Sequence, residues 1–175
     1  MMIAFIGPDM TGKSNIAAEL SEQTGIPVFK NSGEWQTELD SPEYFLNLLR
    51  YGGPFLMDFM RQINSQVILD RFYPCELVYS EAFNRETDLN AISWMDSNFA
   101  EAGGKFIVCL RKDYSGLIDD QYPDDLPTNM LEKLDSGYRS FIDATKCDCL
   151  ILETDDRDLN KQIQKIKIFL EIEEV

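Results

Sequence analysis

The sequence of 175 residues contains no histidine. Imidazole is therefore excluded both as a catalytic base and as a metal ligand. Cysteine is scarce as well, and no two of the four cysteines form a C-x-x-C pair, so a zinc site is not expected. We expect four free thiols, as in a reducing compartment: Cys75, Cys109, Cys147 and Cys149.

Positive charge is also in short supply. The chain has 16 Lys and Arg against 31 Asp and Glu, which gives a net charge of −15 at pH 7. A protein that lies along nucleic acid needs a basic face, so we expect neither stable nucleic-acid binding nor an enzyme that acts on bases within DNA. Any site for phosphate groups must then be a small positive pocket in a negative protein.

Long hydrophobic runs are missing. No apolar stretch approaches the ~20 residues that a membrane helix needs. The apolar run at 2–6 is short and lacks a basic region before it, which favours a buried strand over a signal peptide. We therefore expect a cytoplasmic protein without membrane contact, and a length that suits one domain over residues 1–175.

Short apolar runs alternate with segments of helical spacing. The expected strands are 2–6, 27–30, 66–70, 105–110 and 149–153. The expected helices are 13–23, two pieces within 42–62 separated at Gly52-Gly53-Pro54, 76–83, 89–102, 128–144 and 159–172. This alternation predicts a single-domain α/β fold, with a five-stranded parallel sheet between two layers of helices. The polar stretch 112–127 reads as a lid or binding loop.

The first motif is MIAFIGPDMTGKS at 2–14, with the spacing G-x-x-x-x-G-K-S. Glycines allow a backbone to wrap closely around phosphate, and the helix that begins near Lys13 presents its positive end to the anion. Lys13 would contact the β and γ phosphates of a nucleotide, and Ser14 would hold Mg²⁺. A chance match to a strand–turn–helix is the alternative, but the motif follows a buried strand and opens a helix, as its mechanism requires.

A second motif, VILDRFY at 67–73, ends the third expected strand. Ligands of open α/β sheets bind beyond the carboxyl ends of the strands, where Asp70 and Arg71 stand. Asp70 could bind Mg²⁺ through water, and the Arg71 guanidinium could clamp a phosphate with two parallel bonds. A surface pair that caps the next helix is the competing interpretation.

Together, GPDMTGKS at 7–14, DRFYPCELVYS at 70–80 and the acidic loop after the fourth strand resemble the thymidylate kinase and deoxynucleoside kinase group of P-loop kinases. Within that group the short chain looks most like small phage-type deoxynucleoside monophosphate kinases. Asp70-Arg71-Phe72 resembles the motif of thymidylate kinases, in which an aromatic residue follows Asp-Arg. Deoxynucleoside kinases more often carry a serine in place of the aromatic residue. Asp9 matches the loop aspartate that meets the sugar 3′-hydroxyl in thymidylate kinases.

The resemblance implies an α/β kinase that uses ATP and Mg²⁺ to convert a deoxynucleoside monophosphate to the diphosphate. The residues expected at the ATP are Gly7, Pro8, Asp9, Met10, Thr11, Gly12, Lys13, Ser14 and Asn15. The residues expected to be catalytic are Lys13, Asp70, Arg71 and Arg111.

The sequence also departs from the pattern of this group. Met10 stands where many relatives have an arginine, and residues 113–127 contain no Lys or Arg. Because transition-state charge in phosphoryl transfer needs cations, Arg111 is the first candidate and Arg139 the second. A solvated charge at a strand end is the alternative for Arg111.

For the acceptor phosphate, Arg71 is the expected clamp, with Lys30 beside it and either Arg50 or Arg61 as a further cation. Aromatic rings stack on nucleobases, and the candidates are Phe45, Phe55, Phe59 and Tyr79. For the three phenylalanines, core packing is the simpler interpretation.

Three alternatives stay open. A deoxynucleoside kinase would need a carboxylate base after the second strand, and Glu34 could serve. A nucleotide-binding regulator with little or no turnover is the other class of function. A homodimer could form through 76–83 or the C-terminal helix, although both could equally be core faces.

Overall fold

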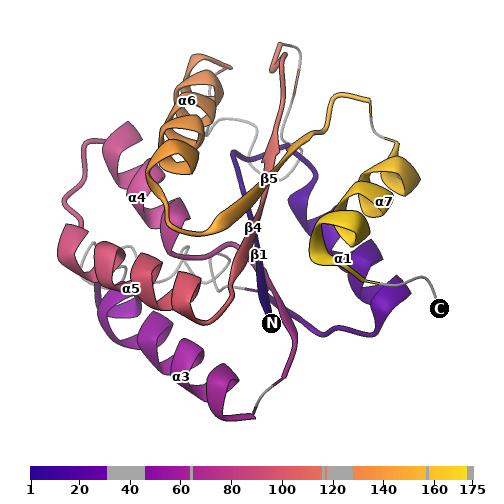
Figure 1. The fold of residues 1–175 in the computed structure, drawn as a ribbon. Coiled ribbons are helices and arrows are strands. Elements are labelled where there is room, and N and C mark those ends of the chain that lie inside the picture. The colour runs from indigo at the N-terminus through magenta and orange to yellow at the C-terminus, as the bar shows by residue number, and fades with distance from the viewer. Residues whose placement is uncertain (31–45, 64, 116, 118–127, 157, 173–175) are drawn as a thin grey trace.

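The computed structural model describes residues 1–30, 46–63, 65–115, 117, 128–156 and 158–172 (Figure 1). The expected α/β architecture is confirmed. Five parallel strands form one sheet in the order β2-β3-β1-β4-β5. The strands are β1 (Met2–Ile6), β2 (Val28–Lys30), β3 (Val67–Asp70), β4 (Lys105–Leu110) and β5 (Asp148–Glu153).

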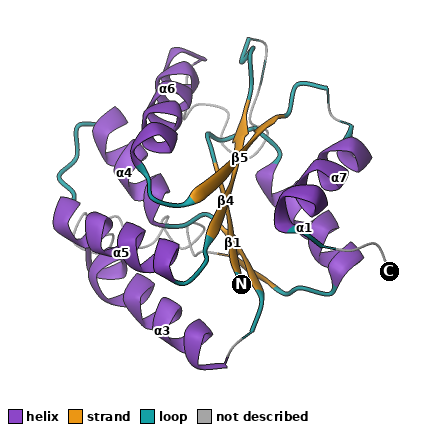
Figure 2. Cartoon of the chain, viewed as in Figure 1, coloured by secondary structure: helices purple, strands orange, loops and turns teal. Residues whose placement is uncertain are grey.

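Helices cover both faces of the sheet (Figure 2). Because side chains alternate along a strand, Ile3 and Phe5 of β1 pack with α1 and α7, while Ala4 and Ile6 pack with the helices of the opposite face. All five β1 residues are buried, which explains the uninterrupted apolar run. The helices are α1 (Lys13–Thr24) and α7 (Leu159–Leu170) on one face, and α3 (Gly53–Ile63), α4 (Tyr73–Ala82), α5 (Leu89–Glu101) and α6 (Thr128–Ala144) on the other.

The expected bounds of β1, β4 and α6 agree with the structure, and the other described elements differ by one or a few residues. The break predicted at Gly52-Gly53-Pro54 is wrong. A π-helical segment, η2 (Leu48–Gly52), runs directly into α3. Pro54 follows this junction by one residue, and its missing N–H removes one hydrogen bond from the helical run there. The two glycines thus mark a change from π-helix to α-helix rather than an interruption.

The two expected motifs follow the neighbouring strands β1 and β3, after which the chain continues on opposite faces of the sheet. After β1 the chain enters α1 on one face, and after β3 it enters α4 on the other face. Phe5 of β1 is paired with Asp70 of β3, so the two strands end at the same level. Such a switch point opens a crevice at the carboxyl edge of the sheet. Among the described residues, no helix is both long and apolar enough to span a bilayer.

Candidate active site

The phosphate loop connects β1 to α1 and requires glycine at two positions for different reasons. Gly12 has a left-handed φ of 77° and is the N-cap of α1. Gly7 has a φ of 139°, and a Cβ there would lie 2.1 Å from the carbonyl oxygen of Cys109 in β4. Gly7 therefore permits close contact between the loop and the sheet, rather than the close approach of a phosphate that the motif suggested.

Lys13 lies beneath this loop and is buried. Its Nζ donates hydrogen bonds to the carbonyl oxygen of Pro8 and, at 3.3 Å, to Oγ1 of Thr11. The Thr11 hydroxyl also donates to the Pro8 carbonyl, at 2.9 Å. Burial, together with the positive charge of Arg71, lowers the pKa of Lys13 to about 8. An anion bound in the loop would offset both the burial of the Lys13 ammonium and its repulsion by Arg71, and so would raise this pKa.

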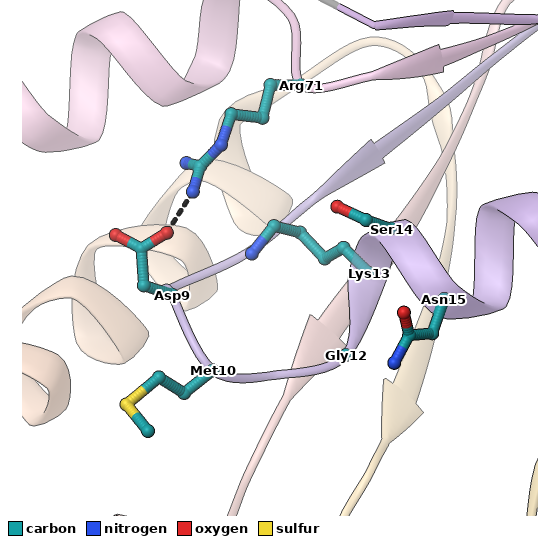
Figure 3. A pocket seen from close by; sticks show the side chains of 7 residues that line it. All are labelled: Asp9, Met10, Gly12, Lys13, Ser14, Asn15 and Arg71. Atoms are coloured by element: carbon teal, nitrogen blue, oxygen red, sulfur yellow. Dashed lines mark hydrogen bonds and ion pairs between the residues drawn. The ribbon is translucent and has the colours of Figure 1, made fainter. Parts of the chain in front are cut away.

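Asp9, Arg71 and Tyr79 form a hydrogen-bonded triad across the mouth of the loop. Arg71 Nη2 donates to Asp9 Oδ1, as Figure 3 shows. The Tyr79 hydroxyl donates to Asp9 Oδ2 at 2.6 Å and accepts from Arg71 Nη1 at 3.5 Å. Burial would raise the pKa of Asp9, but the charges of Arg71 and Lys13 and the Tyr79 bond lower it overall. Asp9 is held as a carboxylate that already has two donors.

Backbone geometry places Arg71 in this triad. Its φ is 70°, unusual for a residue with a side chain, and its N–H extends the sheet by bonding to the Phe5 carbonyl at 3.0 Å. The guanidinium carbon lies 5.6 Å from the centroid of the Tyr79 ring, and that ring stacks on Phe83 at 6.1 Å. Arg71 thus keeps a strained backbone conformation while its side chain contacts Asp9 and Tyr79, and such strain is typical of a functional site.

Asp70 lies next to Arg71 and is buried. Within the part of the chain that the structure describes, its Oδ1 has no hydrogen-bond partner. A buried carboxylate oxygen without a donor is costly unless a cation or water binds it. Ser14 is the second residue of α1, directly after the phosphate loop, and its side chain is exposed. The described residues contain no cluster of three metal-binding side chains. A serine hydroxyl and one carboxylate nevertheless suit Mg²⁺, because this ion keeps most of its bound waters.

A solvent-open hollow of about 140 Å³ lies between the phosphate loop and Arg71 (Figure 3). Most of the loop residues expected at ATP line it, and Arg71 lines it from β3. The lining residues are Asp9, Met10, Gly12, Lys13, Ser14, Asn15 and Arg71. The other three expected residues, Gly7, Pro8 and Thr11, do not line it; they support the loop from below through Cys109 and Lys13.

The two arginines expected to supply a catalytic cation do not line this hollow. Arg111 Nε donates to the Asp113 carbonyl at 3.2 Å and lies 3.9 Å from the Asp155 carboxylate. Arg139 Nε donates to Asp135 at 2.6 Å, within α6. Each is neutralised by a nearby acid, and reaching a nucleotide would require an exchange of partners.

Arg50 and Arg61 both face α5. Arg50 Nε donates to Asp88 at 2.6 Å, and Arg61 Nη2 donates to the Asn98 carbonyl at 2.6 Å. Arg61 is near the end of α3, and Asn98 near the end of α5, so both lie where the chain returns to the amino edge of the sheet. Arg61 therefore lies toward the opposite edge of the sheet from Arg71, a position that does not favour it as the acceptor clamp.

The remaining acceptor candidates are scattered. Lys30 ends β2 opposite Asp70, at the carboxyl edge of the sheet, as expected. Tyr79, expected as a base platform, instead binds Asp9 through its hydroxyl; no sequence pattern links these two residues. Phe55 and Phe59 are exposed on α3 rather than in the core. Glu34, Phe45 and most of the expected lid lie outside the described residues.

Comparison by sequence matches no protein-family profile and no curated protein. Comparison by structure does find similar proteins, and two of the three described here are kinases. YorR of Bacillus subtilis, solved with phosphorylated GDP, is 19% identical, with a TM-score of 0.66 over 98% of this chain and 96% of that chain. Deoxyadenosine kinase of M. mycoides, solved with the products dCMP and dCDP, is 19% identical, with a TM-score of 0.61 over 98% and 99%.

Thymidylate kinase of Ehrlichia chaffeensis is 16% identical, with a TM-score of 0.65 over 97% of this chain and 98% of that chain. At such low identities the likeness establishes the fold. The chain shares its overall fold with these three proteins.

Proposed function

We propose that the protein transfers the γ-phosphoryl group of ATP to a deoxynucleoside monophosphate, forming ADP and a diphosphate. The observation that carries the proposal is the hollow between the phosphate loop and the Asp9–Arg71 pair. One side of it offers a buried ammonium and the N-terminus of α1, and the other offers a guanidinium. An acidic protein has here gathered two cations around a space large enough for phosphate groups.

On the donor side, Lys13 would exchange its bond to the Pro8 carbonyl for the β and γ phosphates of ATP. The N–H groups at the start of α1 would face the same phosphates. Ser14 and Asp70 would hold Mg²⁺, which neutralises charge on the transferred group when bound. The unsatisfied Asp70 oxygen supports this assignment.

On the acceptor side, Arg71 would leave Asp9 and clamp the monophosphate with its two-pronged guanidinium. Asp9 would then accept a hydrogen bond from the sugar 3′-hydroxyl. An acceptor phosphate oxygen attacks the γ phosphorus, the bond to the β–γ bridging oxygen breaks, and ADP leaves. Since the attacking oxygen is already an anion, no protein base is needed. Arg111 would have to leave Asp155 to reach the transferred group.

A deoxynucleoside kinase is the second candidate. It is favoured by the likeness to the deoxyadenosine kinase of M. mycoides. In that case a free nucleoside hydroxyl must lose a proton, and Glu34 is the carboxylate proposed to take it.

A panel of deoxynucleosides and their monophosphates, each incubated with ATP and Mg²⁺, separates the two candidates by chromatography of the products. We expect diphosphates from monophosphates, and only a mild loss in Glu34→Gln. Lys13→Ala is the inactive control. If free nucleosides are the better substrates and Glu34→Gln is inactive, the nucleoside kinase replaces this proposal. If neither the deoxynucleosides nor their monophosphates are phosphorylated, the protein binds nucleotides without transferring a phosphoryl group.

A further inference from the structure

Tyr138 of α6 carries a hydroxyl group that is buried without a partner. The residue is 0% exposed, and among the described residues nothing forms a hydrogen bond with its hydroxyl oxygen. The Cys75 thiol lies against it, but a thiol is a weak hydrogen-bonding group and makes no such bond here. A phenylalanine would fill the same space without an unpaired polar atom. The hydroxyl therefore needs an explanation other than packing.

Two contacts between α4 and α6 locate this hydroxyl in the fold. The Lys133 ammonium donates to the Ala82 carbonyl at 2.7 Å, and a Cβ on Gly137 would lie 2.8 Å from the side chain of Val78. Four residues forward along α6 thus correspond to four residues backward along α4, so the helices are antiparallel neighbours (Figure 1). Tyr138, directly after Gly137, therefore lies against the first half of α4.

The same part of α4 adjoins Arg71. Arg71 precedes the first residue of α4 by two positions, and its guanidinium carbon lies 5.6 Å from the ring centroid of Tyr79. Burial, Cys75 and Tyr79 raise the pKa of Tyr138, while the positive charge of Arg71 acts in the opposite direction. The Tyr138 hydroxyl therefore keeps its proton near the charge of Arg71. It lies on the interior side of that charge, because Tyr138 does not line the hollow.

We propose that Tyr138 is a positioning residue for Arg71, and that its hydroxyl accepts a hydrogen bond from the guanidinium when the acceptor is bound. The inference rests on the proposed function, in which Arg71 leaves Asp9 to clamp a monophosphate. A guanidinium has several N–H donors, and two bonds to a phosphate leave the others to be satisfied. The Tyr138 hydroxyl can accept one of these without competing for the phosphate.

In the free protein, Asp9 holds the guanidinium in place. Arg71 Nη2 donates to Asp9, whereas Nη1 reaches the Tyr79 hydroxyl only at 3.5 Å. When the sugar 3′-hydroxyl takes over Asp9, the guanidinium loses its strongest partner within the protein. An acceptor behind it then fixes the plane of the fork, which a two-pronged contact with phosphate requires. The Tyr138 hydroxyl lacks a partner in the free protein because that partner is still bound to Asp9.

Tyr138→Phe tests the proposal through stability and binding together. The free variant should melt at the wild-type temperature or about 2–4 °C higher, because it loses an unpaired buried hydroxyl. Calorimetric titration with dTMP, dCMP, dAMP and dGMP should show that the monophosphate bound by the wild type binds about tenfold more weakly. ADP binding should be unchanged. An unchanged affinity for the monophosphate overturns the inference, and so does an equal loss for ADP.

The matched control is Tyr73→Phe, the same change in the first residue of α4. Tyr73 is also buried, but its hydroxyl donates to Asp96 of α5 at 2.7 Å. This variant should melt at a lower temperature, because it leaves Asp96 with one donor fewer, and should bind ADP and the monophosphate as the wild type does. If Tyr73→Phe weakens monophosphate binding as much as Tyr138→Phe does, the effect belongs to the packing of α4 and the inference fails.

A double variant shows whether Tyr138 acts through Arg71. In the Arg71→Lys background, Tyr138→Phe should change kcat/KM for the monophosphate by about twofold at most, because the guanidinium that it orients is gone. A further tenfold loss in that background would overturn the inference. A wild type that binds none of the four monophosphates overturns the proposed function and this inference together. Monophosphate binding that is insensitive to Tyr138→Phe overturns the inference alone.

Discussion

Arg71 and Arg111 each follow the last residue of a buried strand, yet only Arg71 lines the phosphate-binding hollow. Arg71 adopts a left-handed backbone conformation that turns its side chain over the loop after β1, toward Asp9. Arg111 is instead engaged by the Asp113 carbonyl and by Asp155, which follows β5. In a protein with twice as many acids as bases, the nearest carboxylate decides where an arginine points.

The comparison separates residues whose side chains already line the hollow from residues that are held away from it. Lys13 and Arg71 lie at the hollow before any nucleotide arrives, whereas Arg50, Arg111 and Arg139 are held by Asp88, Asp155 and Asp135. Variants of the first group should affect catalysis and binding directly. Variants that only remove contacts away from the hollow should leave catalysis and binding unchanged.

Lys13→Ala is expected to have the largest effect, a loss of phosphoryl transfer of about 1,000-fold or more, because it removes the buried ammonium from the transferred phosphate. Steady-state turnover with ATP and a monophosphate measures the loss, and circular dichroism checks the fold. Near-normal turnover in a folded variant would mean that the loop does not hold the donor.

Arg71→Lys should lower turnover by about 100-fold, since a lysine cannot reproduce the planar two-pronged guanidinium that is proposed to clamp the acceptor phosphate. The loss should appear mainly in kcat/KM for the monophosphate. Activity comparable to that of the wild type would remove Arg71 from the acceptor site.

Asp9→Ala should weaken acceptor binding by about 10- to 100-fold, the range for a hydrogen bond to a charged group. ADP binding should change much less. Calorimetric titration of both ligands makes the comparison. Equal losses would place Asp9 at the donor instead.

Binding of ADP should weaken as the pH rises above 8. The pKa of Lys13 in the free protein is about 8, and contact with phosphates raises it, so binding takes up a proton above that pH. The affinity should fall by up to about tenfold per pH unit until the pKa of the bound state is reached. Adenine does not titrate in this range, and Lys13→Ala should show no such dependence.

Arg61→Ala should have the smallest effect on catalysis. Its hydrogen bond to Asn98 is worth about 0.5–1.5 kcal/mol of stability at most, and the site is at the other edge of the sheet. Turnover and both affinities should equal those of the wild type, while the melting temperature falls slightly. A marked rise in KM for the monophosphate would contradict this placement.

Much of this arrangement could be predicted from local patterns. The apolar run at 105–110 and the helical spacing at 128–144 gave the bounds of β4 and α6, because burial and periodicity act over neighbouring residues. The spacing of the phosphate loop located Lys13 and Gly12 for the same reason. The pairing of Phe5 with Asp70 then brings the second motif beside the first.

Contacts between distant residues could not be predicted in this way. The Tyr79 hydroxyl meets Asp9 across 70 residues of sequence, and Arg50 meets Asp88 across 38. The sequence left Arg50 and Arg61 as rival clamps, and only the contact of α3 with α5 shows that Arg61 lies toward the other edge of the sheet. The continuous passage through Gly52 and Gly53 likewise depends on tertiary packing, which overrides their weak helix propensity.

The contact between Gly7 and the Cys109 carbonyl has a consequence for how variants of the protein would be classified. Any other side chain at residue 7 would push β4 away from β1 in the middle of the sheet. A genetic screen for loss of activity would group Gly7 with Lys13, because the two are six residues apart in one motif. A screen for the amount of folded protein in cells would separate them: Gly7 variants would be degraded, whereas Lys13 variants would accumulate as inactive protein.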